Sequence, residues 1–193
     1  MRNPRIEKIV KMGLLCAMSV ALMYVVRFPL ILPFLEYDMA DVPMLIGAFL
    51  YGPFWGLLLV GIVCVLQALT VSAGSGWIGC VMHFVATGAY VLVAGTIYRG
   101  KRTLGGALLG LLLGSLAMML IMVPMNLYLS PLFLMSAEMD YAAAQSSIMG
   151  IVWSFVAFNA IKAGINSSVT YFLYKPVSRL FKKDFFTWEK RAQ

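Results

Sequence analysis

The sequence predicts an all-α integral membrane protein, a six-helix transmembrane bundle with a short second helix. Of its 193 residues, 62% are hydrophobic and 12% are charged, whereas soluble domains average about 45–50% apolar and about 25% charged residues. Apolar segments of spanning length recur along the chain, and basic residues cluster where these segments end, as in membrane proteins. That clustering also argues against nucleic acid as the partner of a chain with net charge +7.

The apolar segments run roughly 9–26, 42–52, 54–72, 78–98, 104–128 and 147–174. The first has a basic start like a signal peptide, but no small-residue cleavage site follows it, so we expect an uncleaved helix. Residues 42–72 are long for one span and short for two. We expect Gly52-Pro53 to divide them, because proline removes a backbone donor and clashes with the preceding turn.

The basic residues predict the orientation of the bundle. They precede the first apolar segment, lie between the fourth and fifth, and follow the sixth. If all three groups face the cytoplasm, the number of spans is even, which six helices satisfy and five do not. Both termini are then cytoplasmic, and the second helix is buried in protein without fully crossing.

The predicted external loop of residues 28–41 contains Pro29, Pro33 and several aromatic residues. We therefore expect it to be ordered and able to cap a site from outside, with its three acidic residues in the loop. Residues 1–175 are expected to form the membrane domain, and 176–193 a basic amphipathic cytoplasmic tail. That tail is either an interfacial helix on anionic lipid or a solvated end with aromatic anchors.

Lys162 is the only charged residue within the last apolar segment. A charge at membrane depth costs at least about 2.5 kcal/mol and usually faces a bundle interior or a cavity. Asn159 and Asn166 are three residues before it and four after it, on the same helix face. The segment therefore predicts a polar ligand pocket among apolar helices.

Other polar residues of the apolar segments are further candidates for this pocket. Asn126 lies near the outer end of the fifth helix, and with Asn159 and Lys162 it could hydrogen-bond a planar heterocycle or a polyhydroxyl chain. His83 and Gln67 either line the same site or bond helix to helix. Tyr37 is a candidate pocket wall, with core packing as the alternative.

The first helix carries small residues at i, i+4 and i+8, which allow another helix to approach closely. These residues are Gly13, Ala17 and Ala21. They serve either internal packing or a partner protein. The fifth helix repeats the spacing at Gly106, Gly110 and Gly114, where we expect internal packing.

Several absences narrow the function. The sequence has no GxxxxGK[ST], HExxH or GxSxG motif and no paired intramembrane carboxylates, so it predicts neither an ATPase nor an enzyme. Cys16, Cys64 and Cys80 are scattered singly, which suggests neither a disulfide framework nor a metal site. We expect no cofactor.

Three stretches carry a resemblance to a known family: residues 34–53, which hold Asp-x-x-Asp-x-Pro and Gly-Pro; residues 76–84; and residues 158–164, which hold Phe-Asn-x-x-Lys. Together they resemble the substrate-binding S components of energy-coupling-factor (ECF) vitamin transporters, and the riboflavin-specific branch fits best. The similarity covers nearly the whole chain. It departs from the pattern at His83, where Asn is common, and at Gln67, where Lys is common.

The resemblance implies a multi-pass protein of a prokaryotic plasma membrane that binds a vitamin near the external face, under the first loop. By motif match, Asn126, Asn159 and Lys162 correspond to pocket residues. Ala17 and Ala21 match an alanine motif that docks on a membrane-embedded T component, and two ATP-hydrolysing subunits would complete the complex. The alternatives are an S component for another vitamin or heterocycle, a stand-alone secondary transporter, and an intramembrane enzyme or signalling scaffold.

Overall fold

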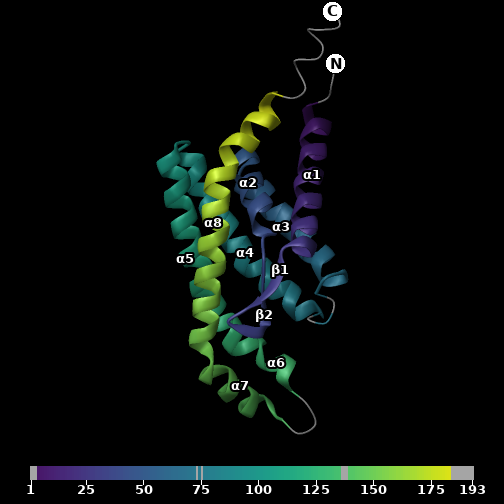
Figure 1. Ribbon diagram of the computed structural model, residues 1–193, viewed down its shortest axis with the longest axis vertical. Coiled ribbons are helices and arrows are strands. Elements are labelled where there is room, and N and C mark those ends of the chain that lie inside the picture. The colour runs from purple at the N-terminus through teal and green to yellow at the C-terminus, as the bar shows by residue number, and fades with distance from the viewer. Residues whose placement is uncertain (1–3, 73, 75, 136–138, 184–193) are drawn as a thin grey trace, which may run out of the picture.

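The structure, a computed structural model, describes residues 4–72, 74, 76–135 and 139–183. It is an elongated helical bundle in which α1 begins and α8 ends at one end, while α6 and α7 lie at the other (Figure 1). The helices are α1 Pro4–Val25, α2 Asp41–Tyr51, α3 Pro53–Leu69, α4 Gly76–Gly100, α5 Leu104–Leu129, α6 Pro131–Leu134, α7 Tyr141–Gly150 and α8 Val152–Lys183. Two strands, β1 Arg27–Leu30 and β2 Leu32–Asp38, connect α1 to α2.

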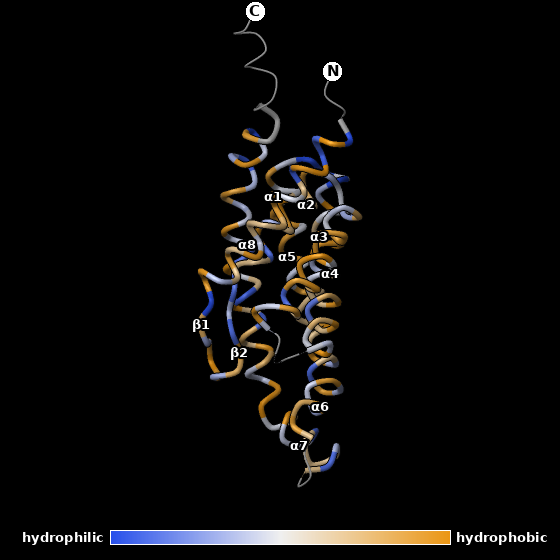
Figure 2. Tube along the Cα trace, turned by 90° about the vertical axis from the view of Figure 1, so that its right-hand side faces the viewer, coloured by the Kyte–Doolittle hydropathy of each residue, from blue (hydrophilic) through white to orange (hydrophobic). Residues whose placement is uncertain are grey.

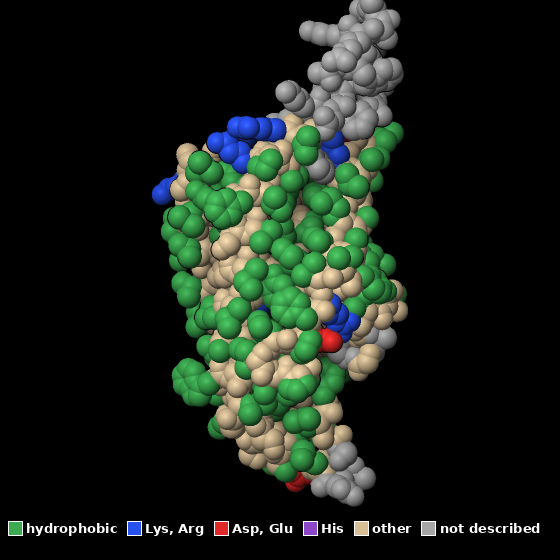
Figure 3. All heavy atoms as spheres, in the orientation of Figure 1, with side chains coloured by type: hydrophobic (Ala, Val, Ile, Leu, Met, Phe, Trp, Pro, Cys, Tyr) green, Lys and Arg blue, Asp and Glu red, His purple; other side chains and the backbone are tan. Residues whose placement is uncertain are grey.

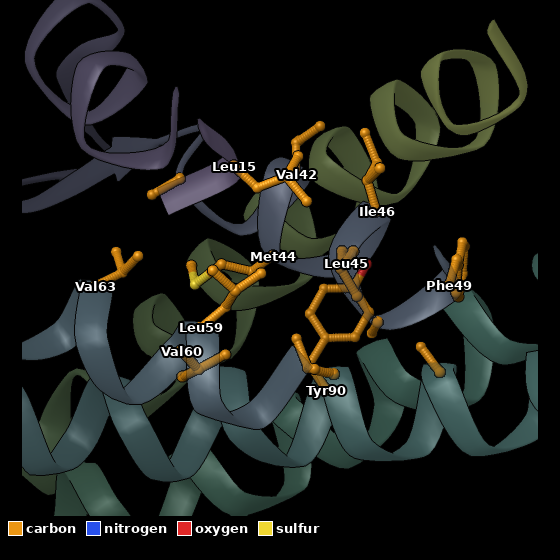
Figure 4. Packing of buried hydrophobic residues seen from close by; sticks show 14 of the residues in the cluster. Leu15, Val42, Met44, Leu45, Ile46, Phe49, Leu59, Val60, Val63 and Tyr90 are labelled. Atoms are coloured by element: carbon orange, nitrogen blue, oxygen red, sulfur yellow. The ribbon is translucent and has the colours of Figure 1, made fainter. Parts of the chain in front are cut away.

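Helix α2 is the central element of the bundle. It contacts α1, α3, α4 and α8, and every residue from Asp41 to Phe49 is buried. Its side chains meet those of Leu59 and Val60 on α3 and Tyr90 on α4 (Figure 4). The expectation of a short second helix surrounded by protein agrees with this placement.

The boundary between α2 and α3 lies at Gly52-Pro53, where the sequence predicts it. Gly52 has φ 99° and ψ 165°, a conformation that side chains with a Cβ rarely adopt. Pro53 occupies the first turn of α3, where its missing N–H costs no helical hydrogen bond.

Close packing of α4 against α5 depends on the small residues of α5. A Cβ at Gly110 would lie 2.8 Å from the carbonyl oxygen of Ala94, and one at Gly114 would lie 2.7 Å from the Tyr90 ring. The expectation that the α5 glycines serve internal packing is therefore confirmed.

The first loop is ordered, as expected, but as an antiparallel hairpin that the sequence did not predict. Arg27 pairs with Asp38 and Phe28 with Tyr37. Ile31, at the tip, has φ 70°, which is unusual for a β-branched residue. Each strand contains a proline, Pro29 in β1 and Pro33 in β2, and a proline within a run argues against a strand.

The last apolar segment, residues 147–174, forms parts of two helices with a bend between them, which the sequence did not predict. The axis bends by 58° between α7 and α8, at Gly150 and Ile151. Glycine is a poor helix former, and the amide of Ile151 bonds back to Ile148 O at 3.1 Å. Helix α8 then continues through Pro176 to Lys183, so it passes the expected domain boundary at 175. The rest of the predicted tail, 184–193, lies outside the described residues.

Within the described ranges, three helices are long and apolar enough to cross a membrane, or four if the bent α7–α8 pair counts as one span. The three are Arg5–Val25, Gly76–Gly100 and Leu104–Leu134, and α2 and α3 are shorter apolar helices. Apolar residues cover most of the length of the bundle (Figure 2). Lys and Arg side chains gather at the end where α1 begins (Figure 3).

Candidate ligand-binding site

A cavity of about 890 Å³ lies between the hairpin and the helices around it, toward the end opposite the basic residues (Figures 1 and 3). Such a volume suits a small organic molecule. Its apolar walls include Met23, Phe34, Met82, Met118, Met122, Phe133, Phe155 and Phe158. Its polar lining includes Asn126, Asn159, Lys162, Gln67, His83, Arg27, Glu36 and Asp38. Five of the six residues proposed from sequence therefore lie against one cavity.

Lys162 extends from α8 to the hairpin. Its side chain is only 6% exposed, and Nζ donates to Oδ2 of Asp38 at 2.8 Å. Burial opposes the charge of Asp38, but the Lys162 ammonium overcomes this and holds the pKa of the carboxyl below its usual value. The two groups form a buried ion pair. Asp38 lies in the loop between α1 and α2, as expected, and its pairing with Lys162 was not predicted.

Asp41, at the start of α2, is a second buried carboxylate that sequence reasoning assigned to the loop. Its Oδ2 accepts from Asn166 Nδ2 at 2.9 Å, and its Oδ1 accepts from Thr87 Oγ1 at 3.1 Å. Asn166 also donates to the backbone oxygen of Asp38 at 3.3 Å. Buried charges are usually paired, so Lys162 implied a partner, but no local feature of the sequence marks Asp38 or Asp41 as that partner.

Tyr37 does not line the cavity, so its prediction as a wall residue is not supported. It is 2% exposed, and its hydroxyl donates to Asn166 Oδ1 at 2.9 Å. Burial raises its pKa to about 12, which keeps the hydroxyl protonated as a donor. Tyr37 therefore fixes β2 to α8 behind the cavity.

Asn159 and Asn126 keep part of their hydrogen-bonding capacity for a ligand. Asn159 Nδ2 donates to Phe155 O, one turn earlier, at 2.8 Å. Asn126 Nδ2 donates to Met122 O at 2.8 Å, while its Oδ1 accepts from Ser130 at 3.0 Å. These bonds orient the two amides against the cavity. Each amide keeps a second N–H donor and acceptor capacity on its oxygen for a ligand.

His83 and Gln67 face the cavity from α4 and α3. His83 Nε2 lies 3.4 Å from Thr87 Oγ1 and 3.8 Å from Asp41 Oδ1. Gln67 Nε2 donates to Ser72 Oγ at 3.3 Å, and its Oε1 is buried without a partner in the described part of the chain. Each of these two side chains therefore lines the cavity and also contacts another part of the chain.

The charges at the rim of the cavity are also paired. Arg27 donates to Glu36 on the neighbouring strand and to the backbone oxygen of Val71 at 2.6 Å. These contacts join the hairpin to the end of α3. With Lys162 matched by Asp38, the lining favours an uncharged ligand that has polar edges and an apolar body.

The stripe of Gly13, Ala17 and Ala21 on α1 faces outward. All three residues are exposed, and a Cβ added at Gly13 would meet nothing within 4 Å. The stripe therefore does not pack against the described helices of this chain.

The sequence matches the model of the family described as "ECF transporter, substrate-specific component" over residues 7–174. Among similar proteins, "Riboflavin transporter RibU" of Staphylococcus aureus is 27% identical over 180 residues, 92% of this chain and 93% of that protein. "Riboflavin transporter FmnP" of Bacillus subtilis is 26% identical over 178 residues, 89% and 94% of the two chains. "Riboflavin transporter RibU" of Lactococcus lactis is 30% identical over 139 residues, which are 69% of this chain and 68% of that protein.

The fold is similar to a solved structure described as "Structure and mechanism of the S component of a bacterial ECF transporter". The TM-score is 0.76 with 25% identity, and the match covers 93% of this chain and 99% of the other.

Proposed function

The chain belongs to the substrate-specific components of ECF transporters, and we propose that it binds riboflavin and delivers it for import. It is a substrate-binding membrane subunit and not an enzyme. A membrane-embedded T component and two ATP-hydrolysing subunits would supply the transport step, since this sequence has no P-loop.

The observation that carries the proposal is the 890 Å³ cavity, which combines apolar walls with amide groups. Riboflavin has a flat ring system with carbonyl and nitrogen acceptors and a ribityl chain with hydroxyl groups. The rings would lie against side chains such as Phe155 and Phe158, while Asn126, Asn159 and Lys162 bond the polar atoms. The relatives named as riboflavin transporters support this choice of vitamin.

We propose that six helices cross or enter the membrane, with both termini in the cytoplasm of a prokaryote. The basic end of the bundle would face inward, which places the cavity toward the outside. Helices α2 and α3 are 11 and 17 residues long, so α2 would not cross alone. The hairpin would then cover the site from the external side.

The outward stripe Gly13, Ala17 and Ala21 would be the docking surface for the T component. Small side chains allow close helix packing in a membrane, and the exposure of this stripe leaves it free for a partner.

The experiment is purification of the chain in detergent, followed by an absorption spectrum between 350 and 500 nm. A flavin band that remains through size exclusion at about one equivalent would support the proposal. A colourless protein that also takes up no added riboflavin would refute it.

Uptake by proteoliposomes separates the proposed importer from a secondary transporter. The chain with T component and ATPases should take up riboflavin only when ATP is inside. Uptake by the chain alone under a proton or sodium gradient would contradict the dependence on partners.

A further inference from the structure

A second, smaller hollow lies at the basic end of the bundle. It measures about 310 Å³ and is separate from the cavity described above. The end of α2, the start of α3 and the α4–α5 connection form it. Its lining residues are Ala48, Phe49, Leu50, Tyr51, Gly52, Pro53, Phe54, Trp55, Arg99 and Arg102.

The charge of this hollow is entirely positive. Arg99 and Arg102 line it, and neither has a hydrogen-bond or ion-pair partner among the described residues. No carboxylate lines it. Glu7, the acidic residue on the described part of α1, is bonded to Lys11. The hollow therefore has two guanidinium groups with no internal anion.

A third cation lies at its edge. Lys8 Nζ is 3.7 Å from the ring centroid of Trp55 and 5.5 Å from that of Tyr51. This contact fixes α1 beside the hollow and places an ammonium next to two lining residues. Guanidinium and ammonium groups together are the usual donors to a phosphate.

The hollow is lined by Tyr51 and Trp55, and Tyr and Trp are typical of the level of lipid headgroups. Trp55 lies against it, and Phe54 beside it is 71% exposed. Aromatic side chains of this kind collect at membrane interfaces, and basic pockets between helices there bind anionic headgroups.

An exposed apolar stripe continues from the hollow along α3. Phe54, Leu58, Ile62, Val65 and Leu69 follow one another at three- or four-residue spacing, and each is 45–73% exposed. Acyl chains could lie along this face while the headgroup occupies the hollow. A free phosphate would make no use of the stripe.

We propose that Arg99 and Arg102 bind the phosphate of an anionic phospholipid, with Lys8 at the edge and the acyl chains along α3. The site would hold one lipid at the headgroup level of the leaflet that the basic end of the bundle faces. It is independent of the vitamin, because no residue of the hollow lines the large cavity.

The test compares the protein with an Arg99→Gln/Arg102→Gln double variant, each in nanodiscs of phosphatidylcholine with and without phosphatidylglycerol. Native mass spectrometry should show one phosphatidylglycerol retained by the parent, and retention about five- to thirtyfold weaker in the variant. The control is Lys175→Gln/Arg179→Gln, which removes two basic residues of α8 that do not line the hollow. This control should retain the lipid like the parent.

Two results would overturn the proposal. One is equal retention by the parent and the Arg99/Arg102 variant. The other is that millimolar inorganic phosphate displaces the bound lipid as effectively as added phosphatidylglycerol does. That result would assign the hollow to a free anion. Riboflavin titration of each variant provides a folding check, and its failure in the parent would refute the proposed function without affecting the lipid result.

Discussion

At the residue scale, the central feature is a buried ion pair and not an isolated ammonium. Lys162 bonds Asp38, while Asp41 and Asn166 extend the network to Thr87 and to Tyr37. Burial of two carboxylates and one ammonium is tolerated because the ammonium pairs with one carboxylate and hydrogen bonds satisfy the remaining carboxylate oxygens. The network holds Lys162 in the cavity lining and at the same time fixes the hairpin.

The first prediction concerns this pair. Lys162→Met should lower the free energy of unfolding by about 3–5 kcal/mol, because it leaves the Asp38 charge buried without a partner. The double variant Lys162→Met/Asp38→Leu should be markedly more stable than Lys162→Met. The measurement is chemical unfolding in mixed micelles.

A matched cycle on Glu7 and Lys11, a more exposed pair, should give a coupling energy below about 1 kcal/mol. If the Lys162 and Asp38 substitutions proved additive, the two groups would not act as a pair.

The second prediction concerns Asn159. Asn159→Leu removes an amide of the cavity lining and should weaken riboflavin binding by about 1–3 kcal/mol, because a buried ligand acceptor or donor loses its partner. The measurement is isothermal titration calorimetry. Gln145→Leu is the control, since that amide bonds Leu127 O and lies outside the cavity. Equal loss in both variants would point to general destabilisation.

Part of this site was predictable from single residues. Lys162, Asn159 and Asn126 stand out because polar groups are costly within apolar segments. Asp38 and Asp41 do not, because acidic residues between two spans are ordinary in a solvated loop. Their burial depends on the hairpin folding back onto α2 and α8, which is a tertiary event that local sequence does not encode.

At the element scale, the hairpin is the part of the fold that closes the cavity. It contributes Phe34, Glu36 and Asp38 to the lining, and it is held by the Tyr37–Asn166 bond and by Arg27, which bonds Glu36 and Val71. Apolar length and Gly-Pro punctuation predicted the helices. They did not predict the hairpin, because each of its strands contains a proline, and they did not predict the bend at Gly150.

The third prediction follows from this closure. Tyr37→Phe should increase hydrogen exchange in β2 and speed riboflavin release about fivefold, because it removes a hydrogen bond of about 1 kcal/mol that joins the hairpin to α8. Exchange mass spectrometry and stopped-flow fluorescence measure the two effects.

Tyr141→Phe is the matched control, since its hydroxyl bonds Tyr128 O outside the cavity. An unchanged release rate in Tyr37→Phe would mean that the hairpin does not limit ligand exit.

At the scale of the whole molecule, the two ends and the outer face differ in composition. The cavity lies toward one end, the basic residues gather at the other, and the small-residue stripe of α1 faces outward. Composition and charge were enough to predict a helical membrane protein, because both depend on the solvent and not on the details of packing.

The fourth prediction concerns docking. Ala17→Trp should abolish ATP-driven riboflavin uptake and leave riboflavin binding intact, because the indole prevents close approach of a partner helix. Leu116→Trp is the control, since it enlarges an exposed residue of α5, and it should retain uptake. Normal uptake by Ala17→Trp in proteoliposomes with the partner subunits would remove the stripe from the docking surface.

The most direct test of the central claim is calorimetric titration of the purified, flavin-free chain with riboflavin and, separately, with thiamine. The cavity and its lining predict saturable binding of one riboflavin per chain, with no heat from thiamine at the same concentration. Absence of riboflavin binding by a folded, monodisperse sample, or tighter binding of thiamine, would contradict it.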